Sequence, residues 1–334
     1  MKNDLTTSKL LKLGCLYPFI AFMLAVVLVA IFGDDDNAEN KSETEQVETA
    51  DSTTQKEPVV NEVLEGDPYQ ELDELIGLGA VKKEVRSLAN FVKVQKQREA
   101  QGLKIPKMSY HLVFTGSPGT GKTTVARIVA RIYKDLGILK KGHTVETDRS
   151  GLVAKYMGQT ALKTDTLIQK ALNGVLFIDE AYALVPEDGS GSDYGQEAIS
   201  TLLKRMEDYR DSLVVIIAGY PNEMKRFIDS NPGLQSRFNR YIDFPDYTAG
   251  ELKDIFNMYM RKNQYTMSDE TARYLEEQLE YVVAHKDRNF GNARYCRNLF
   301  EKSITNQANR LMGVSNASKQ QLMEITIEDI QKAL

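Results

Sequence analysis

The stretch that decides the fold of this chain is a glycine-rich loop, which reads Gly116-Ser117-Pro118-Gly119-Thr120-Gly121-Lys122-Thr123 and is followed by Thr124. An apolar run over 110–114 precedes the loop, and apolar residues at helical spacing follow it. Strand, loop and helix in this order predict a phosphate-binding loop, because the glycines let backbone N–H groups turn onto phosphate oxygens. Lys122 can reach the β- and γ-phosphates, and the Thr123 hydroxyl can hold Mg²⁺. The loop predicts ATP and Mg²⁺ as ligands, but it does not say whether the phosphate is bound, transferred or hydrolysed.

Two carboxylates follow a second apolar run, over 174–178, whose composition is typical of a buried central strand. Ligands of open α/β sheets bind at the carboxyl ends of the strands, which is where Asp179 and Glu180 fall. Asp179 can hold Mg²⁺, and Glu180 can orient and deprotonate an attacking water. The alternative is an acidic strand end on a solvated loop. Together with the phosphate loop, the two acids indicate one site and favour hydrolysis over transfer to a small acceptor.

The rest of the pattern alternates between short β-rich runs and helices. We expect a helix over 80–101 and strands near 110–115, 144–147, 174–178, 213–218 and 241–244. Strands that alternate with helices predict an α/β fold in which a parallel sheet has helices on both faces. After Tyr247 the pattern becomes helical, over 248–264, 269–284, 291–312 and 326–333, and Thr326 caps the last of these helices. The chain is therefore expected to hold a nucleotide-binding domain over 68–247 and a small helical lid domain over 248–334.

Residues 13–33 carry no charged side chain and follow a short N-terminal tail, 1–12. About 20 helical residues span about 30 Å, the thickness of a bilayer core, so this segment predicts a single transmembrane anchor. A cleaved signal peptide or a buried core helix are the alternatives. A signal peptide has a shorter apolar region, of about 7–15 residues, and a small-residue cleavage site.

The orientation of this anchor is open to two interpretations. Lys2, Lys9 and Lys12 precede the segment and three aspartates follow it, which favours an N-terminus in the cytoplasm and a C-terminal part outside. ATP, however, is a cytoplasmic fuel. We give the phosphate loop more weight and expect a single-pass membrane protein whose ATPase domain faces the cytoplasm.

Residues 34–67 contain 12 acidic and two basic residues, a net charge of −10, whereas the whole chain carries −5. Such a polar, acidic stretch is expected to be a disordered linker. The remainder of the chain is mildly basic, without the strongly basic face that nucleic-acid binding requires, so no nucleic acid is expected as a partner. The two cysteines, Cys15 and Cys296, form no disulfide framework or metal pattern, and Cys296 is expected to pack in a helix.

Several longer strings go beyond these two motifs. They are 75–78 (Leu-Ile-Gly-Leu), 111–124 (the phosphate loop with its strand), 175–184 (Val-Leu-Phe-Ile-Asp-Glu-Ala-Tyr-Ala-Leu), 217–220 (Ile-Ala-Gly-Tyr) and 230–238 (Ser-Asn-Pro-Gly-Leu-Gln-Ser-Arg-Phe). With them, residues 70–330 resemble the AAA+ ATPases of the CbxX/CfqX type, a group that includes the CbbX activase of red-type Rubisco and the stage V sporulation protein K-like ATPases.

The resemblance implies roles for three further polar residues. Arg237 matches the arginine finger, which enters the site of a neighbouring subunit and stabilises charge on the γ-phosphate; Arg240 is the competing candidate. Arg294, in the string Phe290-Gly-Asn-Ala-Arg294, matches the sensor-2 arginine of the lid. Asn222 matches the nucleotide-sensing residue after the fourth strand, although it could instead cap the helix that follows.

The resemblance also implies a pore loop. Tyr156-Met157-Gly158 matches the aromatic–hydrophobic–glycine segment of hexameric AAA+ motors. An exposed ring can grip an extended peptide through apolar contact, and glycine lets the loop swing. The alternative is a core tyrosine at the edge of a helix.

Together these features predict a membrane-anchored ATPase that forms a homo-oligomeric ring, a hexamer, and that remodels or threads a protein substrate. The alternative is an ATP-dependent scaffold or switch that threads nothing. The anchor and the linker depart from the soluble Rubisco activases, and no residue selects Rubisco as the substrate.

Overall fold

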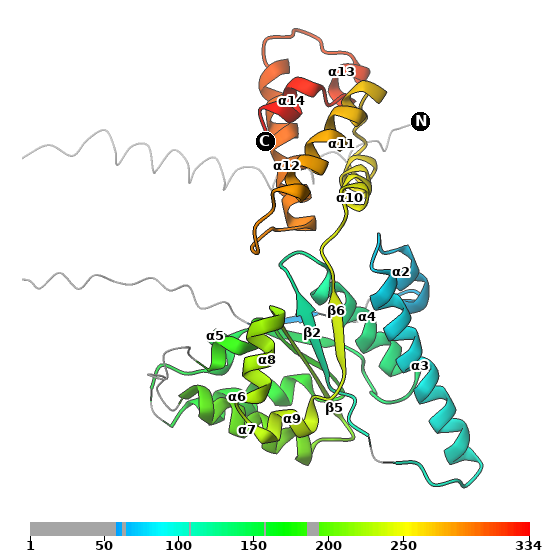
Figure 1. Ribbon diagram of the computed structural model, residues 1–334, viewed down its shortest axis with the longest axis vertical. Coiled ribbons are helices and arrows are strands. Elements are labelled where there is room, and N and C mark those ends of the chain that lie inside the picture. Colours follow the sequence, from blue (N-terminus) through cyan, green and yellow to red (C-terminus); the bar gives the residue numbers. More distant parts are fainter. Residues whose placement is uncertain (1–57, 62–64, 107, 157, 186–193) are drawn as a thin grey trace, which may run out of the picture. The chain divides into compact units, whose positions relative to one another are not determined.

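The computed structural model describes residues 58–61, 65–106, 108–156, 158–185 and 194–334 (Figure 1). The expected tail, the transmembrane segment 13–33 and most of the linker 34–67 lie outside the described residues. Within the part that is described, no helix is long and apolar enough to cross a bilayer.

The described part of the chain forms one six-stranded sheet with the order β1-β3-β4-β5-β2-β6. Its strands are β1 (Val59–Asn61), β2 (Leu112–Gly116), β3 (Thr144–Thr147), β4 (Gly174–Ile178), β5 (Leu213–Gly219) and β6 (Tyr241–Phe244). Strands β2 to β6 pair in parallel, as the alternating pattern predicts. The phosphate-binding strand β2 lies between β5 and β6, two strands away from β4 with its two acids.

The edge strand β1 corrects two predictions. It pairs with β3 in antiparallel orientation, so the sheet is mixed and not parallel throughout. It also lies inside the stretch 34–67 that composition assigns to a disordered linker. Val59 and Val60 are β-branched residues that remain about half exposed, and the Asn61 amide donates to Glu146 Oε1 at 2.6 Å. Three residues in an acidic stretch are too short a run to show alternation, so only pairing with β3 reveals the strand.

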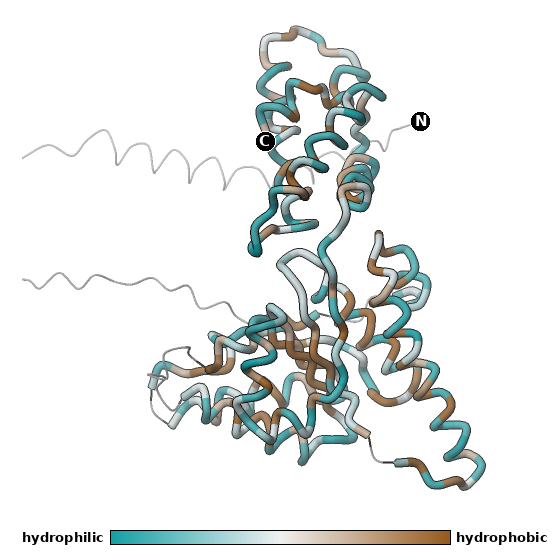
Figure 2. The backbone as a smooth tube through the Cα atoms, in the orientation of Figure 1, coloured by the Kyte–Doolittle hydropathy of each residue, from teal (hydrophilic) through white to brown (hydrophobic). Residues whose placement is uncertain are grey.

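Helices cover both faces of the sheet. Those of the α/β domain are α2 (Pro68–Glu74), α3 (Gly79–Ala100), α4 (Lys122–Asp135), α5 (Arg149–Leu152), α6 (Thr160–Ala171), the 3-10 helix η1 (Ala181–Leu184), α7 (Tyr194–Asp208), α8 (Pro221–Asp229) and α9 (Pro232–Arg237). Strand residues alternate between two cores: Leu112 and Phe114 pack with α3 and α4, whereas Val113 packs with α6 to α9. Figure 2 shows hydrophobic residues concentrated in the central strands of the sheet.

The C-terminal part is helical, as expected, and comprises α10 (Ala249–Lys262), α11 (Asp269–Ala284), α12 (Ala293–Leu311), α13 (Lys319–Met323) and α14 (Ile327–Gln331). The pattern misses the short helix α13. Thr326 takes the predicted N-cap position of α14, where its N–H and hydroxyl both donate to Asp329 at 2.9 Å. Cys296 is fully buried on α12, and burial raises the pKa of its thiol to about 12, so it is a packing residue as predicted.

Candidate functional site

The phosphate loop connects β2 to α4 through backbone that only glycine adopts easily. Gly116, Gly119 and Gly121 all have positive φ, of 147°, 71° and 95°. Gly121 is the N-cap of α4 and offers no side chain to bond the first helical N–H groups, so these donors remain for a ligand. Unpaired N–H groups at the positive end of a helix dipole form an anion site.

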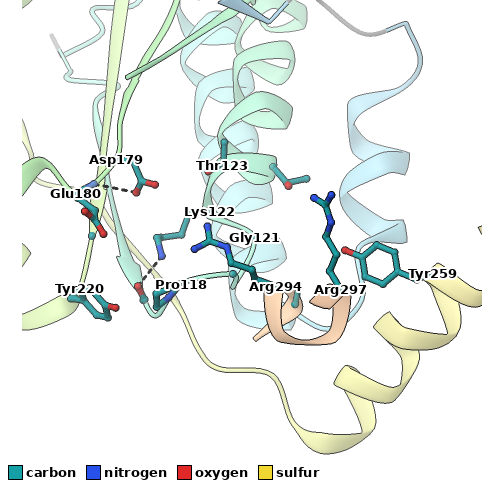
Figure 3. Close-up of a pocket in the computed structure, with 15 residues that line it drawn as sticks. Pro118, Gly121, Lys122, Thr123, Asp179, Glu180, Tyr220, Tyr259, Arg294 and Arg297 are labelled. Carbon is teal, nitrogen blue, oxygen red and sulfur yellow. Dashed lines mark hydrogen bonds between the residues drawn. The ribbon is translucent and has the colours of Figure 1, made fainter. Parts of the chain in front are cut away.

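A cavity of ≈330 Å³ opens at this loop. Seven of its lining residues belong to the loop and the first turn of α4: Gly116, Pro118, Gly119, Gly121, Lys122, Thr123 and Thr124. The others come from four more elements: Asp179, Glu180, Gly219, Tyr220, Tyr259, Ala293, Arg294 and Arg297. The structure thus brings the phosphate loop, the two acids after β4 and Arg294 together in one site, as the sequence predicts. Figure 3 shows Lys122, Asp179, Glu180 and Arg294 around the same space.

Ser117 and Thr120 belong to the loop but do not line the cavity. Thr120 is fully buried, and its hydroxyl donates to the Ser117 carbonyl at 2.8 Å. This bond holds the loop's own turn together. Both residues therefore support the conformation of the loop without lining the cavity.

Lys122 is the buried cation of the site. Its Nζ donates to the carbonyls of Gly116 and Ser117, each at 2.8 Å. Burial lowers the pKa of the Lys122 ammonium, nearby Asp179 opposes that shift and Arg294 adds to it. An anionic ligand beside Lys122 would favour the charged ammonium, so the site is suited to phosphate.

Asp179 and Glu180 follow β4 directly. Asp179 is half-buried, and its Oδ1 accepts the Glu180 N–H at 3.1 Å. Glu180 is exposed and has a φ of 48°, in the left-handed region that a residue with a side chain seldom adopts. Such local strain is found where a side chain must be aimed at a site. Here it turns the chain sharply between β4 and η1, and Glu180 lines the cavity.

The donor set of the site fits Mg²⁺. Thr123 and Asp179 both line the cavity and also a neighbouring one of ≈300 Å³. No group of three or more His, Cys, Asp and Glu side chains among the described residues could hold a metal alone. Mg²⁺ is normally bound by one or two protein oxygens together with phosphates and water, so a hydroxyl and a carboxylate beside a phosphate site are sufficient.

The cavity includes residues that sequence reasoning missed. Arg297 lies one helical turn after Arg294 on α12, a spacing of three that could have indicated a shared face. Its Nε donates to Glu301 at 2.8 Å. Tyr259 on α10 also lines the cavity, but it belongs to no motif that could have identified it from the sequence.

Tyr220, and not Asn222, reaches the cavity after β5. Tyr220 occupies the N-cap of α8, so Asn222 is not the cap that the sequence offered as its alternative role. Asn222 is exposed in the first turn of α8 and is not among the residues that line the cavity. The tyrosine hydroxyl donates to Asn289 Oδ1 at 3.3 Å and so joins α8 to the loop before α12.

Arg237 lies outside the cavity of its own chain, at the end of α9. Within the described part of the chain its guanidinium makes only long contacts: 3.3 Å to the Gly233 carbonyl, 3.5 Å to Ser236 and 3.6 Å to Glu207. Its buried Nε has no hydrogen-bond partner among the described residues. The competing Arg240 instead lies over the Phe91 ring, 5.1 Å from the centroid.

The expected pore-loop residues lie between α5 and α6. The Tyr156 side chain is 70% exposed, which excludes the alternative of a core tyrosine. Gly158 has a φ of 76° with open space where a Cβ would be. Met157 lies outside the described residues.

Comparisons with known proteins agree with this geometry. The family model of ATPases associated with various cellular activities (AAA) matches residues 112–246, and that of the AAA lid domain matches residues 248–334. The AAA domain of FIGL-1, solved in complex with ADP, superposes with a TM-score of 0.58 at 19% identity over 83% of this chain and 86% of that one, which shows the shared fold.

Curated relatives match at higher identity. Stage V sporulation protein K of Bacillus subtilis is 42% identical over 78% of this chain and 81% of its own length. The chloroplastic ribulose bisphosphate carboxylase/oxygenase activase of Cyanidioschyzon merolae is 43% identical over 83% of this chain and 93% of its own. Protein CbxX of Cupriavidus necator is 44% identical over 77% and 81%. The chain belongs to the AAA+ ATPases of the CbxX/CfqX type and is an ATP hydrolase that uses ATP with Mg²⁺.

Proposed function

We propose that this ATPase is a membrane-anchored ring, a hexamer, that uses ATP hydrolysis to remodel or thread a protein near the membrane. The observation that carries the remodelling part is Tyr156, a 70% exposed aromatic side chain beside a glycine with positive φ. A large exposed ring on a segment that can swing is suited to gripping an extended peptide without reading its sequence.

Hydrolysis is assigned to the residues of the cavity. Lys122 and the loop N–H groups would bind the phosphates, and Thr123 and Asp179, which line the same cavity, would hold Mg²⁺, whose charge would neutralise the phosphate oxygens. Glu180 orients the attacking water and accepts its proton. Arg294 lines the cavity from the first turn of α12, where it would contact the nucleotide and link its state to the position of the lid. Asn222 is exposed and does not line the cavity, so a role as nucleotide sensor requires that α8 shift when nucleotide binds.

A ring explains the position of Arg237. The residue is too loosely held to be a structural ion pair, since its contacts are 3.3–3.6 Å long. By comparison, Arg310 binds both oxygens of Asp329 at 3.0 and 2.7 Å. A cation with weak partners and no access to its own pocket is suited to completing the pocket of a neighbouring subunit.

The membrane part of the proposal rests on the uncharged segment 13–33, which has the length of a bilayer span. The ATPase domain is placed in the cytoplasm, where ATP is available. Protease added to sealed inverted vesicles should digest the ATPase domain, and protease added to right-side-out vesicles should leave it intact. The reverse result would refute the cytoplasmic placement, and release of the chain by carbonate washing would refute the anchor.

A two-step experiment tests the remodelling function. The full chain with Glu180→Gln, which should bind ATP without turnover, is first used to trap substrates in membranes. Tyr156→Ala is then compared with the parent chain for ATP-dependent change in the protease sensitivity of the trapped protein. The matched control is Tyr281→Ala, which removes a 63% exposed tyrosine from α11.

We expect Tyr156→Ala to keep ATP hydrolysis and to lose remodelling, while Tyr281→Ala keeps both. If Tyr156→Ala remodels as well as the parent, threading is wrong and an ATP-dependent scaffold or switch becomes the better account. The identity of the protein substrate, including any Rubisco, would come from the trapping step.

A further inference from the structure

Asn292 is a fully buried polar residue that does not line the nucleotide cavity. It precedes α12 and has φ 47° and ψ −121°, a conformation close to the glycine-favouring first central position of a type II′ turn. Although it is the N-cap of α12, its side chain makes no capping bond to that helix. A residue with a Cβ in this conformation indicates that its side chain is needed for other contacts.

The Asn292 amide joins three separate segments. Its Oδ1 accepts the Tyr247 N–H at 3.0 Å, at the connection between β6 and α10. Its Nδ2 lies 3.2 Å from the Pro118 carbonyl of the phosphate loop, 2.9 Å from Asp246 Oδ1 and 3.1 Å from the Phe290 carbonyl. The partners require this orientation of the amide, because one side meets a donor and the other meets three acceptors.

An amide NH₂ has two hydrogens for these three acceptors, so at least two of the acceptors share one hydrogen. Asp246 is held as a carboxylate: burial opposes its charge, but hydrogen bonds from Lys286, Asn292 and Ser117 outweigh burial and lower the pKa of Asp246. A side chain without a hydrogen-bond donor at position 292 would remove the bonds to the Pro118 and Phe290 carbonyls and one of the bonds that hold Asp246 as a carboxylate.

The neighbouring residues strengthen the same connection. The Ala293 N–H donates to the Gly119 carbonyl at 3.1 Å. A Cβ on Gly119 would lie 2.1 Å from the Gly291 carbonyl, so the loop and the lid are in direct contact. Two successive carbonyls of the phosphate loop, those of Pro118 and Gly119, are thus bound by lid residues.

These bonds fix the direction of loop N–H groups. In a trans peptide the C=O and the following N–H point in opposite directions. Holding the Pro118 and Gly119 carbonyls on the lid side therefore orients the N–H groups of Gly119 and Thr120. The same contacts position the start of α12, from which Arg294 and Arg297 reach the cavity.

We propose that Asn292 is a positioning residue that couples the phosphate loop to the lid of the same subunit, so that nucleotide binding and lid placement stabilise each other. The inference concerns ATP binding and hydrolysis alone and does not depend on the membrane or remodelling role. Failure of one would leave the other intact.

The test is Asn292→Gly in the full-length chain. Glycine adopts this backbone conformation without strain, so the substitution removes the amide while keeping the turn. The matched control is Asn316→Gly, which replaces an exposed asparagine of the lid with φ 65°. Binding of ATP and ADP is measured with fluorescent analogues well below the unfolding temperature, together with kcat and KM.

We expect Asn292→Gly to weaken nucleotide binding by roughly tenfold or more, the loss of one to two well-placed hydrogen bonds, and to raise KM more than it lowers kcat. The effect of Arg294→Ala on nucleotide affinity should shrink in the Asn292→Gly background, because the arginine is then no longer positioned. Asn316→Gly should bind as the parent does. A folded Asn292→Gly chain with affinity within about twofold of the parent, or full additivity with Arg294→Ala, would overturn the proposal.

A measurement on the unsubstituted chain covers the case in which Asn292→Gly does not fold. Hydrogen exchange at the Tyr247 and Ala293 amides, which bond Asn292 Oδ1 and the Gly119 carbonyl, should slow when ATP binds. Protection of the phosphate-loop amides without any change at these two amides would show that loop and lid are not coupled.

Discussion

At the scale of single residues, Glu180 combines features that point to one role. It is exposed, it lines the cavity and its backbone takes a left-handed conformation directly after β4. Asp179, one residue earlier, is half-buried and accepts the Glu180 N–H. The two adjacent acids are therefore not equivalent, which is consistent with one holding Mg²⁺ and the other acting on water.

Replacing Glu180 with glutamine should separate binding from turnover. Glu180→Gln keeps the size and polarity of the side chain but cannot accept a proton, so kcat should fall by about 10²- to 10⁴-fold while ATP affinity stays near that of the parent. Steady-state turnover and nucleotide titration measure the two. Glu277→Gln on α11, an exposed glutamate away from the cavity, serves as the control. Rapid turnover by Glu180→Gln would remove it as the catalytic base.

His111, at the entry to β2, is buried and links two strands, since its Nδ1 accepts the Val215 N–H at 2.9 Å. Burial, and secondarily the charge of Arg237, lower the pKa of His111 to about 4. In the unfolded chain the His111 imidazole is protonated below a pH of about 6.5, whereas in the folded chain it is protonated only near pH 4. Stability present above pH 6.5 is therefore lost as the pH falls through that window.

The matching prediction concerns the pH dependence of unfolding. Between pH 7 and pH 5, His111 should account for about 2 kcal/mol of lost stability. His111→Asn, whose amide oxygen can accept the Val215 N–H but does not titrate, should lose less stability over this range than the parent. Denaturant unfolding at both pH values measures the difference. Equal losses in the two chains would show that His111 does not titrate in this way.

At the scale of elements, the phosphate loop depends on what packs behind it. Gly119 has a φ of 71°, and the nearest atom to a Cβ there is the Gly291 carbonyl oxygen of the lid, at 2.1 Å. The glycine is thus required twice, for its backbone angle and for the close approach of lid backbone. The pattern of a phosphate loop explains the first requirement, and only the folded lid explains the second.

Gly119→Ala should therefore abolish ATP binding or weaken it by more than about tenfold, because the added methyl pushes the lid away from the loop. Gly250→Ala is the matched control, since nothing lies within 4 Å of a Cβ at that position in α10. Alanine in a helix should be neutral or stabilising by up to about 1 kcal/mol there. Nucleotide titration and thermal unfolding of both chains test the pair, and normal ATP binding by Gly119→Ala would contradict the contact.

At the scale of the whole molecule, the predicted arginine finger lies apart from the cations that line the cavity. Lys122, Arg294 and Arg297 line the cavity, and Arg237 does not. If Arg237 acts in the next subunit, activity belongs to the interface between subunits. Shared activity would be a property of the assembly. The support for it within one chain is that Arg237 has only long contacts among the described residues.

Mixing two inactive chains tests that sharing. Arg237→Ala lacks the arginine and Lys122→Ala lacks the pocket, so each should be inactive alone. In mixed rings, a Lys122→Ala subunit can supply Arg237 to the intact pocket of its neighbour, restoring at most about a quarter of parental activity when subunits mix at random. Absence of any recovery in rings shown to be mixed would argue against a shared site.

A feature of this protein could be predicted from the sequence when its residues lie close together along the chain. The phosphate loop, Asp179-Glu180 and Arg294 lie in continuous strings whose order along the chain implies a strand end or a helix start, so the core of the site could be predicted. Tyr220, Tyr259 and Arg297 could not be predicted with the same certainty, because they meet the loop only after strands and helices distant in sequence have packed.

The sequence by itself determined the chemistry at the loop and the class of fold, since glycine spacing and apolar periodicity act over a few residues. The tertiary structure decided that β1 extends the sheet in antiparallel orientation, that Arg237 lies outside its own cavity and that Asn292 binds the Pro118 carbonyl. These features depend on contacts between segments far apart in the chain. The role of a buried amide can be recognised only when its hydrogen-bond donors and acceptors are known, and no local sequence pattern identifies these partners.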